Sequence, residues 1–246
     1  MTDIPDANAA IWKSDGGIAY WVATAEDRER GRAEPRRLVA DLLPFDDGDE
    51  ITFVDLGAGT GAAARAILDR YSRAEAVLAD FSPQMIAEGI RELAPYAGRY
   101  RYVELDLGSD AWPRDIPTEL DAVVSSLCVH HLPDEGKRQL FGEVFAHLAP
   151  GGWYLNYDPV TAGDPVVEAA WERAGDRRDP SAAHARAHRT EEERLRYENH
   201  VRYMMPLAPQ LDLLRSAGFE GVDAYWKRLG EVIYGGRRPS GSTGEP

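Results

Sequence analysis

A run of apolar side chains at residues 51–56 is broken abruptly by three glycines at alternate positions, Gly57, Gly59 and Gly61. The run is typical of a buried strand, and the alanine-rich residues 62–71 predict a helix directly after the glycines. A strand, a glycine turn and a helix N-terminus in this order bring backbone N–H groups against a nucleoside-type ligand. We therefore predict a βα unit with a ligand at its turn.

Strands and helices continue to alternate beyond this unit. Further strands are predicted at residues 76–80, 100–105, 120–127 and 153–157. A helix at 82–93 begins with Ser82 as N-cap and Pro83 in its first position, and a second helix covers 134–148. Alternation at this spacing is typical of parallel βαβ units, which predicts an open, doubly wound α/β sheet.

The pattern changes after the fifth strand. Residues 163–205 contain only helical or loop signals, including a capping box at Thr190 and Glu193. Two strands at 221–229 and 231–234 are joined at Gly230, too close together for a crossover helix. That connection predicts a closing antiparallel hairpin.

Composition and charge limit the class of protein. The 246 residues carry 42 acidic and 28 basic side chains, a net charge of −14, which disfavours nucleic acid and anionic membranes as partners. The single cysteine, Cys128, excludes an intramolecular disulfide and a cysteine-based zinc cluster. No apolar run reaches the length of a membrane span, and Asp3 and Asp6 stand where a signal peptide would be basic. We expect a soluble, cytoplasmic protein.

A dinucleotide such as NAD is the first competing ligand. Gly57, Gly59 and Ala62 satisfy the dinucleotide fingerprint, and Asp80 lies at about the expected spacing for a ribose-binding acid. However, Asp55 at the mouth of the turn would repel a pyrophosphate and would suit a cationic ligand. The terminal hairpin is also foreign to the usual dinucleotide-binding half.

Four ordered motifs resemble those of class I S-adenosylmethionine (SAM)-dependent methyltransferases. They are Asp55-Leu56-Gly57-Ala58-Gly59-Thr60-Gly61, Asp80-Phe81-Ser82, Glu104-Leu105-Asp106 and Leu148-Ala149-Pro150-Gly151-Gly152. The resemblance implies an α/β fold with a doubly wound, seven-stranded, mostly parallel sheet and an antiparallel last strand, plus a helical lid and insertion.

The resemblance also implies roles for site residues. Asp80 would accept both ribose hydroxyls, and Asp106 with the backbone of Leu107 would meet the adenine amino group. Asp55 would attract the methionine ammonium, and Phe81 is placed to stack on adenine, with simple core packing an equal alternative. A sulfonium cofactor needs no metal, so an acidic pocket is chemically sensible.

Further cofactor contacts come from loops. The backbone of Ser126 would approach the methionine end, and Tyr20 belongs to an N-terminal aromatic segment that either forms a lid or packs on the sheet edge. An arginine near this segment could pair the cofactor carboxylate, although the sequence does not select which. The turn itself would be lined by Gly57, Ala58, Gly59 and Gly61.

Two adjacent histidines, His130 and His131, follow the fourth strand, beside the expected position of the reactive methyl group. A zinc half-site is disfavoured because neighbours on an extended segment point to opposite faces and no further ligand stands nearby in sequence. We therefore predict no metal. His131 is the predicted general base, with His130 behind it, and a purely structural role for both is the alternative.

The expected domain organisation follows from these assignments. It comprises an N-terminal helical lid (1–35), the SAM-binding Rossmann-like core (36–160), a helical insertion over the substrate (161–206), the closing helix and hairpin of the core (207–238), and a disordered tail (239–246). The insertion follows the fifth strand at the edge where open sheets bind ligands. Its candidate substrate-binding residues are Trp171, Tyr197, His200 and Tyr203.

The predicted function is SAM-dependent methyl transfer to O, N or C of a small organic acceptor, mainly by proximity and orientation. Two alternatives remain open: a carboxy-SAM synthase-like enzyme, faintly suggested by Tyr197-Glu198-Asn199, and a non-catalytic SAM-binding module. The expected partner is a small-molecule acceptor, without nucleic acid or membrane, and a homodimer is left open.

Overall fold

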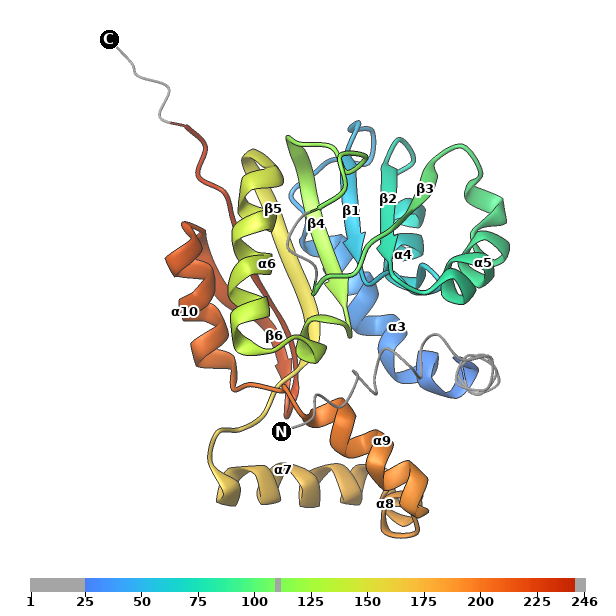
Figure 1. The fold of residues 1–246 in the computed structure, drawn as a ribbon, viewed down its shortest axis with the longest axis vertical. Coiled ribbons are helices and arrows are strands. Elements are labelled where there is room, and N and C mark those ends of the chain that lie inside the picture. The colour runs from blue at the N-terminus through green and yellow to red at the C-terminus, as the bar shows by residue number, and fades with distance from the viewer. Residues whose placement is uncertain (1–24, 109–111, 242–246) are drawn as a thin grey trace, which may run out of the picture.

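A computed structural model describes residues 25–108 and 112–241 and contains one seven-stranded sheet (Figure 1). The strand order is β3-β2-β1-β4-β5-β7-β6. Strands β1 to β5 pair in parallel, whereas β7 is antiparallel to both of its neighbours, β5 and β6. The predicted fold class is confirmed. The strands are β1 (Thr52–Leu56), β2 (Glu75–Asp80), β3 (Tyr100–Glu104), β4 (Leu120–Ser126), β5 (Leu148–Pro159), β6 (Glu220–Arg228) and β7 (Glu231–Arg237).

The register of the parallel strands aligns their C-terminal ends. Leu56 of β1 stands opposite Ala79 of β2 and Ser125 of β4, and Asp80 stands opposite Glu104 of β3. The turn after β1 and the last residues of β2, β3 and β4 therefore lie along one edge. Ligands bind open α/β sheets at this edge.

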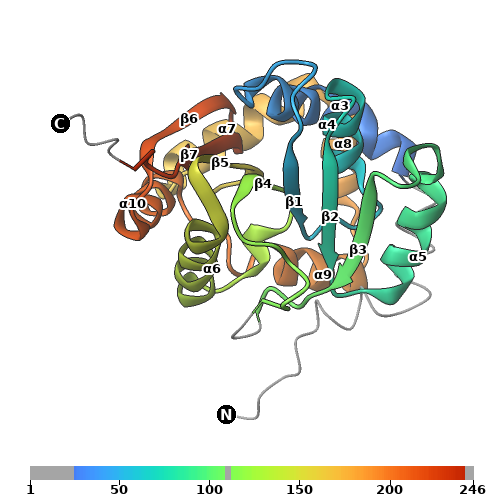
Figure 2. The same ribbon diagram turned by 90° about the horizontal axis from the view of Figure 1, so that it is seen from above.

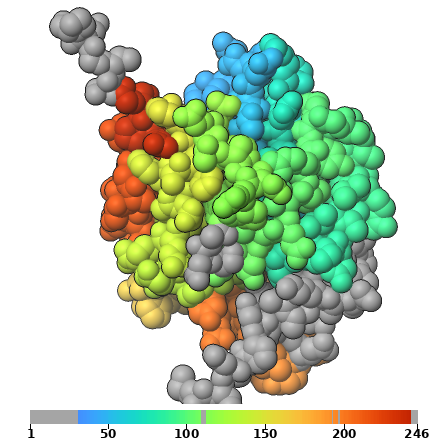
Figure 3. Space-filling model, turned by 45° about the horizontal axis from the view of Figure 1, so that its top comes forward, coloured from blue at the N-terminus to red at the C-terminus, as the bar shows by residue number. Residues whose placement is uncertain are grey.

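Helices cover both faces of the sheet (Figure 2). One face packs against α3 (Ala25–Leu42), α4 (Ala62–Arg70) and α5 (Pro83–Glu92), and the other against α6 (Asp134–His147) and α10 (Leu207–Ala217). Figure 3 shows the second face, with α6 beside the segment that follows β3. Adjacent residues of β1 serve different cores, since Phe53 packs towards α4 and Val54 towards α6.

Several element boundaries follow directly from local sequence. The Ser82 hydroxyl accepts a hydrogen bond from Met85 N at 3.3 Å, as expected for the N-cap of α5. Thr190 and Glu193 form the predicted capping box of α9 (Glu191–Val201). Gly218 ends α10 with a φ of 105°, a left-handed conformation that favours glycine.

The helical insertion consists of α7 (Pro165–Arg178), α8 (Pro180–Ala187) and α9 (Glu191–Val201) and lies beyond the C-terminal ends of the parallel strands (Figure 1). A bridge between Thr161 and Pro206 closes its base. The insertion is thus anchored over the ligand-binding edge.

Two boundaries differ from expectation. Strand β5 begins at Leu148 and includes Pro150-Gly151-Gly152, because this segment forms an irregular extension of the β4–β5 ladder. The expected lid boundary at residue 35 falls inside α3, which runs on to Leu42 and packs on α4. Among the described helices, none is long and apolar enough to cross a membrane.

Candidate functional site

The glycine turn after β1 leaves no room for side chains. Gly57 has a φ of 64°, and a Cβ on it would lie 2.1 Å from the Cys128 sulfur. Gly59 has a φ of 55°, and its N–H donates to Asp80 Oδ2 at 2.8 Å. The backbone of the turn therefore packs directly against Cys128, in the loop after β4. Only glycine tolerates both the conformation and the contact at Gly57.

Asp55 lies buried beneath this turn, with 1% of its surface exposed. Its Oδ2 accepts a hydrogen bond from Ala64 N at 3.0 Å. Its Oδ1 is also buried and has no hydrogen-bond partner among the residues that the structure describes. Burial raises the pKa of this carboxyl to about 7, against the Ala64 N–H and the nearby Arg36, which lower it. An unsatisfied buried acceptor of this kind fits a cationic donor.

Asp80 holds the turn in place. Besides the Gly59 bond, its Oδ1 accepts a hydrogen bond from Ser82 N at 2.9 Å, so the carboxylate ties the glycine turn to the start of α5. Burial raises the pKa of Asp80, and the backbone N–H groups oppose the rise. A carboxylate has about four lone pairs, so the three backbone donors of Ser82, Gly59 and Phe81 leave room for a ribose hydroxyl. The motif alone did not reveal this structural role.

The other predicted cofactor residues lie along the same edge. Asp106 is exposed, and its Oδ1 accepts a hydrogen bond from Gly108 N at 2.9 Å. Phe81 is half-buried. The Ser126 hydroxyl accepts a hydrogen bond from Arg36 Nε at 3.1 Å, so the fold brings Arg36 to this edge. Tyr20 lies outside the described residues.

The two adjacent histidines form a cluster with a third. His130 and His131 lie on the 3-10 turn η2 (Val129–His131), and His200 comes from α9, 70 residues away. The His130 and His131 ring centroids are 3.9 Å apart. The His130 Nε2 and His200 Nδ1 atoms are 3.3 Å apart. His200, predicted as a substrate contact, thus belongs to the same group as the predicted base.

Asp158 at the end of β5 fixes the first ring of this cluster. Its Oδ2 accepts a hydrogen bond from the His130 backbone N–H, and its Oδ1 lies 2.7 Å from His130 Nδ1. Both residues are almost fully buried. Because Asp158 occupies Nδ1, the Nε2 atom of His130 is directed to His200.

The expectation that His130 and His131 point to opposite faces is wrong. It assumed an extended segment, whereas His131 N donates to Cys128 O at 3.0 Å and closes a 3-10 turn. In this turn the two rings lie together, with centroids 3.9 Å apart. The argument used against a metal site therefore fails: the ligand nitrogens of His130, His131 and His200 all lie within 4.8 Å of one another.

Burial keeps two of these rings neutral. It lowers the pKa of His131 to about 2 and that of His200 to about 4, with further lowering from neighbouring positive groups. The Nδ1 atom of His131 is buried and has no hydrogen-bond partner in the described part of the chain. Such a ring is a weak base, which weighs against His131 as the group that removes a proton.

The remaining substrate candidates have other surroundings. Trp171 packs beside Gly230, with the Lys227 Nζ atom 4.6 Å from its ring centroid. Tyr197 is 40% exposed and lies under the Arg189 guanidinium. Neither geometry points to a substrate pocket, so both assignments remain predictions.

Lys137 is a buried residue that the motif analysis missed. Its Nζ donates to Leu132 O and, at 2.7 Å, to Tyr203 O. These two hydrogen bonds join the segment after η2 to the end of the insertion. They hold the backbone of Tyr203 through its carbonyl oxygen. A signal was present, because Lys137 stands in the apolar stripe of α6 formed by Leu140, Phe141 and Val144.

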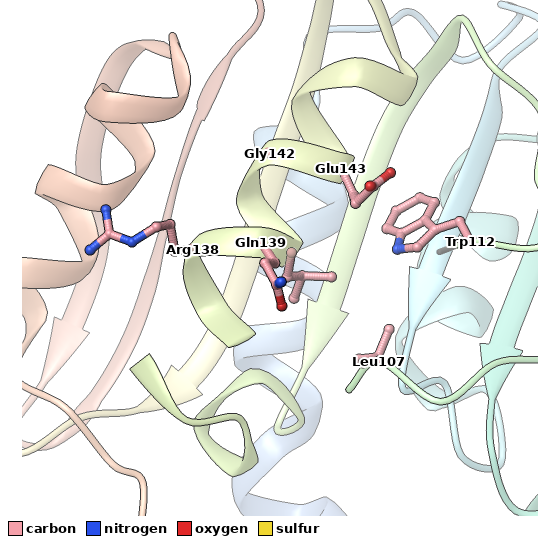
Figure 4. Close-up of a pocket in the computed structure, with 7 residues that line it drawn as sticks. Leu107, Trp112, Arg138, Gln139, Gly142 and Glu143 are labelled. Atoms are coloured by element: carbon pink, nitrogen blue, oxygen red, sulfur yellow. The ribbon is translucent and has the colours of Figure 1, made fainter. Parts of the chain in front are cut away.

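A separate pocket lies between α6 and the segment after β3 (Figure 4). Its volume of about 210 Å³ is below the usual range of about 300–1,000 Å³ for small-molecule sites. Figure 4 shows Trp112 and Glu143 close together and Arg138 directed away from them. We assign it no ligand. It is lined by Leu107, Trp112, Arg138, Gln139, Leu140, Gly142 and Glu143.

Residues 54–154 match the family model of a methyltransferase domain. Malonyl-[acyl-carrier protein] O-methyltransferase of Halorhodospira halophila is 33% identical over 138 residues, which cover 55% of this chain and 42% of that protein. Trans-aconitate 2-methyltransferase of an Azoarcus species is 32% identical over 145 residues, 58% of this chain and 53% of that protein. The chain thus spans about half the length of these curated relatives.

The fold resembles solved structures over nearly its whole length. Human N-acetylserotonin methyltransferase, solved in complex with SAM, superposes with a TM-score of 0.62 at 18% identity. The match covers 94% of this chain and 58% of that one. At this identity the match establishes a shared fold.

Proposed function

We propose that this chain is a class I SAM-dependent methyltransferase that transfers a methyl group from SAM to O, N or C of a small organic acceptor. The family match runs from within β1 to within β5 and includes the glycine turn. The roles of the individual site residues are part of the proposal.

The buried, unsatisfied Oδ1 of Asp55 is the observation that carries the proposal. The atom lies under a glycine turn, where a pyrophosphate would be repelled and an ammonium group would gain a charge-assisted hydrogen bond. Asp80 would accept the ribose hydroxyls with its remaining lone pairs, and Asp106 with Leu107 would meet the adenine. Arg36, beside Ser126, would face the cofactor carboxylate.

SAM supplies a methyl group on a sulfonium, an already activated carbon. The carbon–sulfur bond breaks as the bond to the acceptor atom forms, leaving S-adenosylhomocysteine (SAH). The protein contributes mainly by holding both partners in line and excluding water. The histidine cluster lies at the end of β4, where we place the acceptor atom and the departure of its proton.

A small acceptor agrees with two observations. The insertion covers the ligand-binding edge, and the net charge of −14 disfavours nucleic acid. The two curated relatives are named for malonyl-[acyl-carrier protein] and for trans-aconitate, which also supports a small acceptor group.

The test is turnover of SAM by the purified full chain with a panel of small hydroxyl, carboxyl and amine acceptors. We expect SAH and a methylated acceptor in equal amounts, detected by mass spectrometry, from one or more acceptors. At SAM concentrations below the wild-type dissociation constant, Asp80→Ala should lower both products in proportion to its loss of cofactor affinity. Glu75→Ala, which removes an exposed carboxylate at the opposite end of β2, should leave them unchanged. SAM binding without turnover across the panel would favour a non-catalytic module, and a carboxylated sulfonium would favour a carboxy-SAM synthase.

A further inference from the structure

Three imidazole rings converge at one end of the site from two distant parts of the chain. His130 and His131 come from η2 and His200 from α9, and their ligand nitrogens lie within 4.8 Å of one another. We propose that His130, His131 and His200 form a binding site for a divalent transition-metal ion, with zinc as the expected ion.

The separation of the best-placed pair fits tetrahedral coordination. Zinc–nitrogen bonds of about 2.0–2.1 Å at a tetrahedral angle put two ligand nitrogens about 3.3–3.4 Å apart. The His130 Nε2 and His200 Nδ1 atoms are 3.3 Å apart. Two neutral rings at this distance share either one proton or one cation.

The third ring favours the cation. A shared proton between His130 and His200 would leave the buried Nδ1 of His131 unsatisfied among the described residues. An ion that His131 bound through Nδ1 would satisfy it.

Asp158 provides the support that metal-binding histidines need. A ligating histidine donates its other ring N–H to a carboxylate or carbonyl, which fixes the tautomer and the ring orientation. Asp158 Oδ1 accepts from His130 Nδ1, and Asp158 Oδ2 accepts the His130 backbone N–H. The Nε2 atom of His130 is thereby left for the ion, and Asp158 acts as a positioning residue.

A carboxylate also lies beside the site, since Asp158 Oδ1 is 2.7 Å from His130 Nδ1. Three protein ligands leave a tetrahedral ion with one open position.

That open position gives the ion a role, which rests on the proposed methyl transfer. An acceptor oxygen bound there loses its proton to solvent at a lower pH than the free hydroxyl. The ion would thereby supply a deprotonated acceptor oxygen, which would form the new bond to the methyl carbon as the carbon–sulfur bond breaks. The substrate class is therefore an acceptor with a hydroxyl or carboxyl oxygen.

The test uses the chelator-treated full chain titrated with Co²⁺ alone, followed by absorption at about 500–650 nm. We expect one equivalent to bind with an intense tetrahedral spectrum, and Zn²⁺ to displace it. His200→Ala should weaken binding by more than a hundredfold, and Asp158→Asn by about 10- to 100-fold. SAH binding by the same variants serves as the check that they fold.

The matched control is His184→Ala. His184 and His188 lie on or next to α8 with ring centroids 4.0 Å apart, and they form the competing pair. This variant should bind Co²⁺ like the wild type. The proposal is overturned if the wild type gives no tetrahedral spectrum, or if His184→Ala removes binding while His200→Ala retains it. None of these readouts needs methyl transfer, so the metal site and the proposed function can fail separately.

Discussion

The two ends of the candidate site are built in different ways. At the glycine turn, Asp55, Gly57 and Asp80 lie on or directly after neighbouring strands, and the two carboxylates accept hydrogen bonds from backbone N–H groups nearby in sequence or on the turn itself. At the histidine cluster, the partners His130 and His200 are 70 residues apart. The first end is encoded locally, whereas the second exists only once the insertion has docked. We therefore expect cofactor binding to survive changes that disturb acceptor binding.

Gly57→Ala should have the largest effect, because it breaks the locally encoded end. The new Cβ would lie 2.1 Å from the Cys128 sulfur at a φ of 64°. We expect a loss of roughly 2–4 kcal/mol in the free energy of unfolding. Urea denaturation measures it. The double variant Gly57→Ala/Cys128→Gly should recover part of the loss, and no recovery would show that contact with Cys128 is not the cause.

Asp80→Ala should have the second-largest effect, which is a loss of cofactor affinity. It removes the predicted ribose contacts and the tie between Gly59 and Ser82. We expect a loss of about 2–3 kcal/mol, or roughly 30- to 160-fold in the SAH dissociation constant. Calorimetric titration measures this, with Glu75→Ala as the control. An unchanged constant would remove Asp80 from the cofactor site.

Lys137→Met tests the other end of the comparison. The change keeps an apolar chain of similar length but removes the donor shared by Leu132 O and Tyr203 O. We expect the free energy of unfolding to fall by about 1.5–2 kcal/mol and amide exchange in α9 to become faster. SAH affinity should stay within about twofold. A comparable loss of SAH affinity would mean that the glycine turn and the histidine cluster are not independent.

The smallest effect is a pH dependence of cofactor binding. Burial raises the pKa of Asp55 from 3.8 to about 7, so the carboxyl is largely protonated below pH 7 in the free protein. Because the ammonium group of SAH favours the ionised form, affinity should rise by about tenfold from pH 6 to pH 8. The asparagine variant Asp55→Asn should show a flat profile. A wild-type affinity that falls over this range would contradict the role of Asp55.

The raised pKa of Asp55 also makes the stability of the protein depend on pH. The folded protein keeps a proton on Asp55 that the unfolded chain releases near pH 3.8. The contribution of this carboxyl to the free energy of unfolding is therefore largest at low pH and falls as the pH rises to about 7.

The sequence predicted the sheet and the cofactor edge well because their signals are local. Apolar runs, capping residues and glycines identify strands, helix starts and turns without knowledge of distant partners, as the Ser82 cap and the Gly218 stop illustrate. The strand alternation then places Asp55 and Asp80 at one edge.

The histidine cluster could not be predicted in the same way. Its geometry depends on a 3-10 turn at His130 and His131, where the sequence predicted an extended segment. It also depends on His200, which comes from a distant segment. Asp158 stands at the end of a strand whose length depends on pairing with β7. Lys137 alone carried a local signal, a charge within an apolar stripe.

A crystal structure of the chain with bound SAH tests the central claim most directly. The account predicts that the amino group of SAH lies within hydrogen-bond distance of Asp55 Oδ1 and that both ribose hydroxyls contact Asp80. An amino group elsewhere, with Asp55 Oδ1 still unsatisfied and the ribose away from β2, would contradict it.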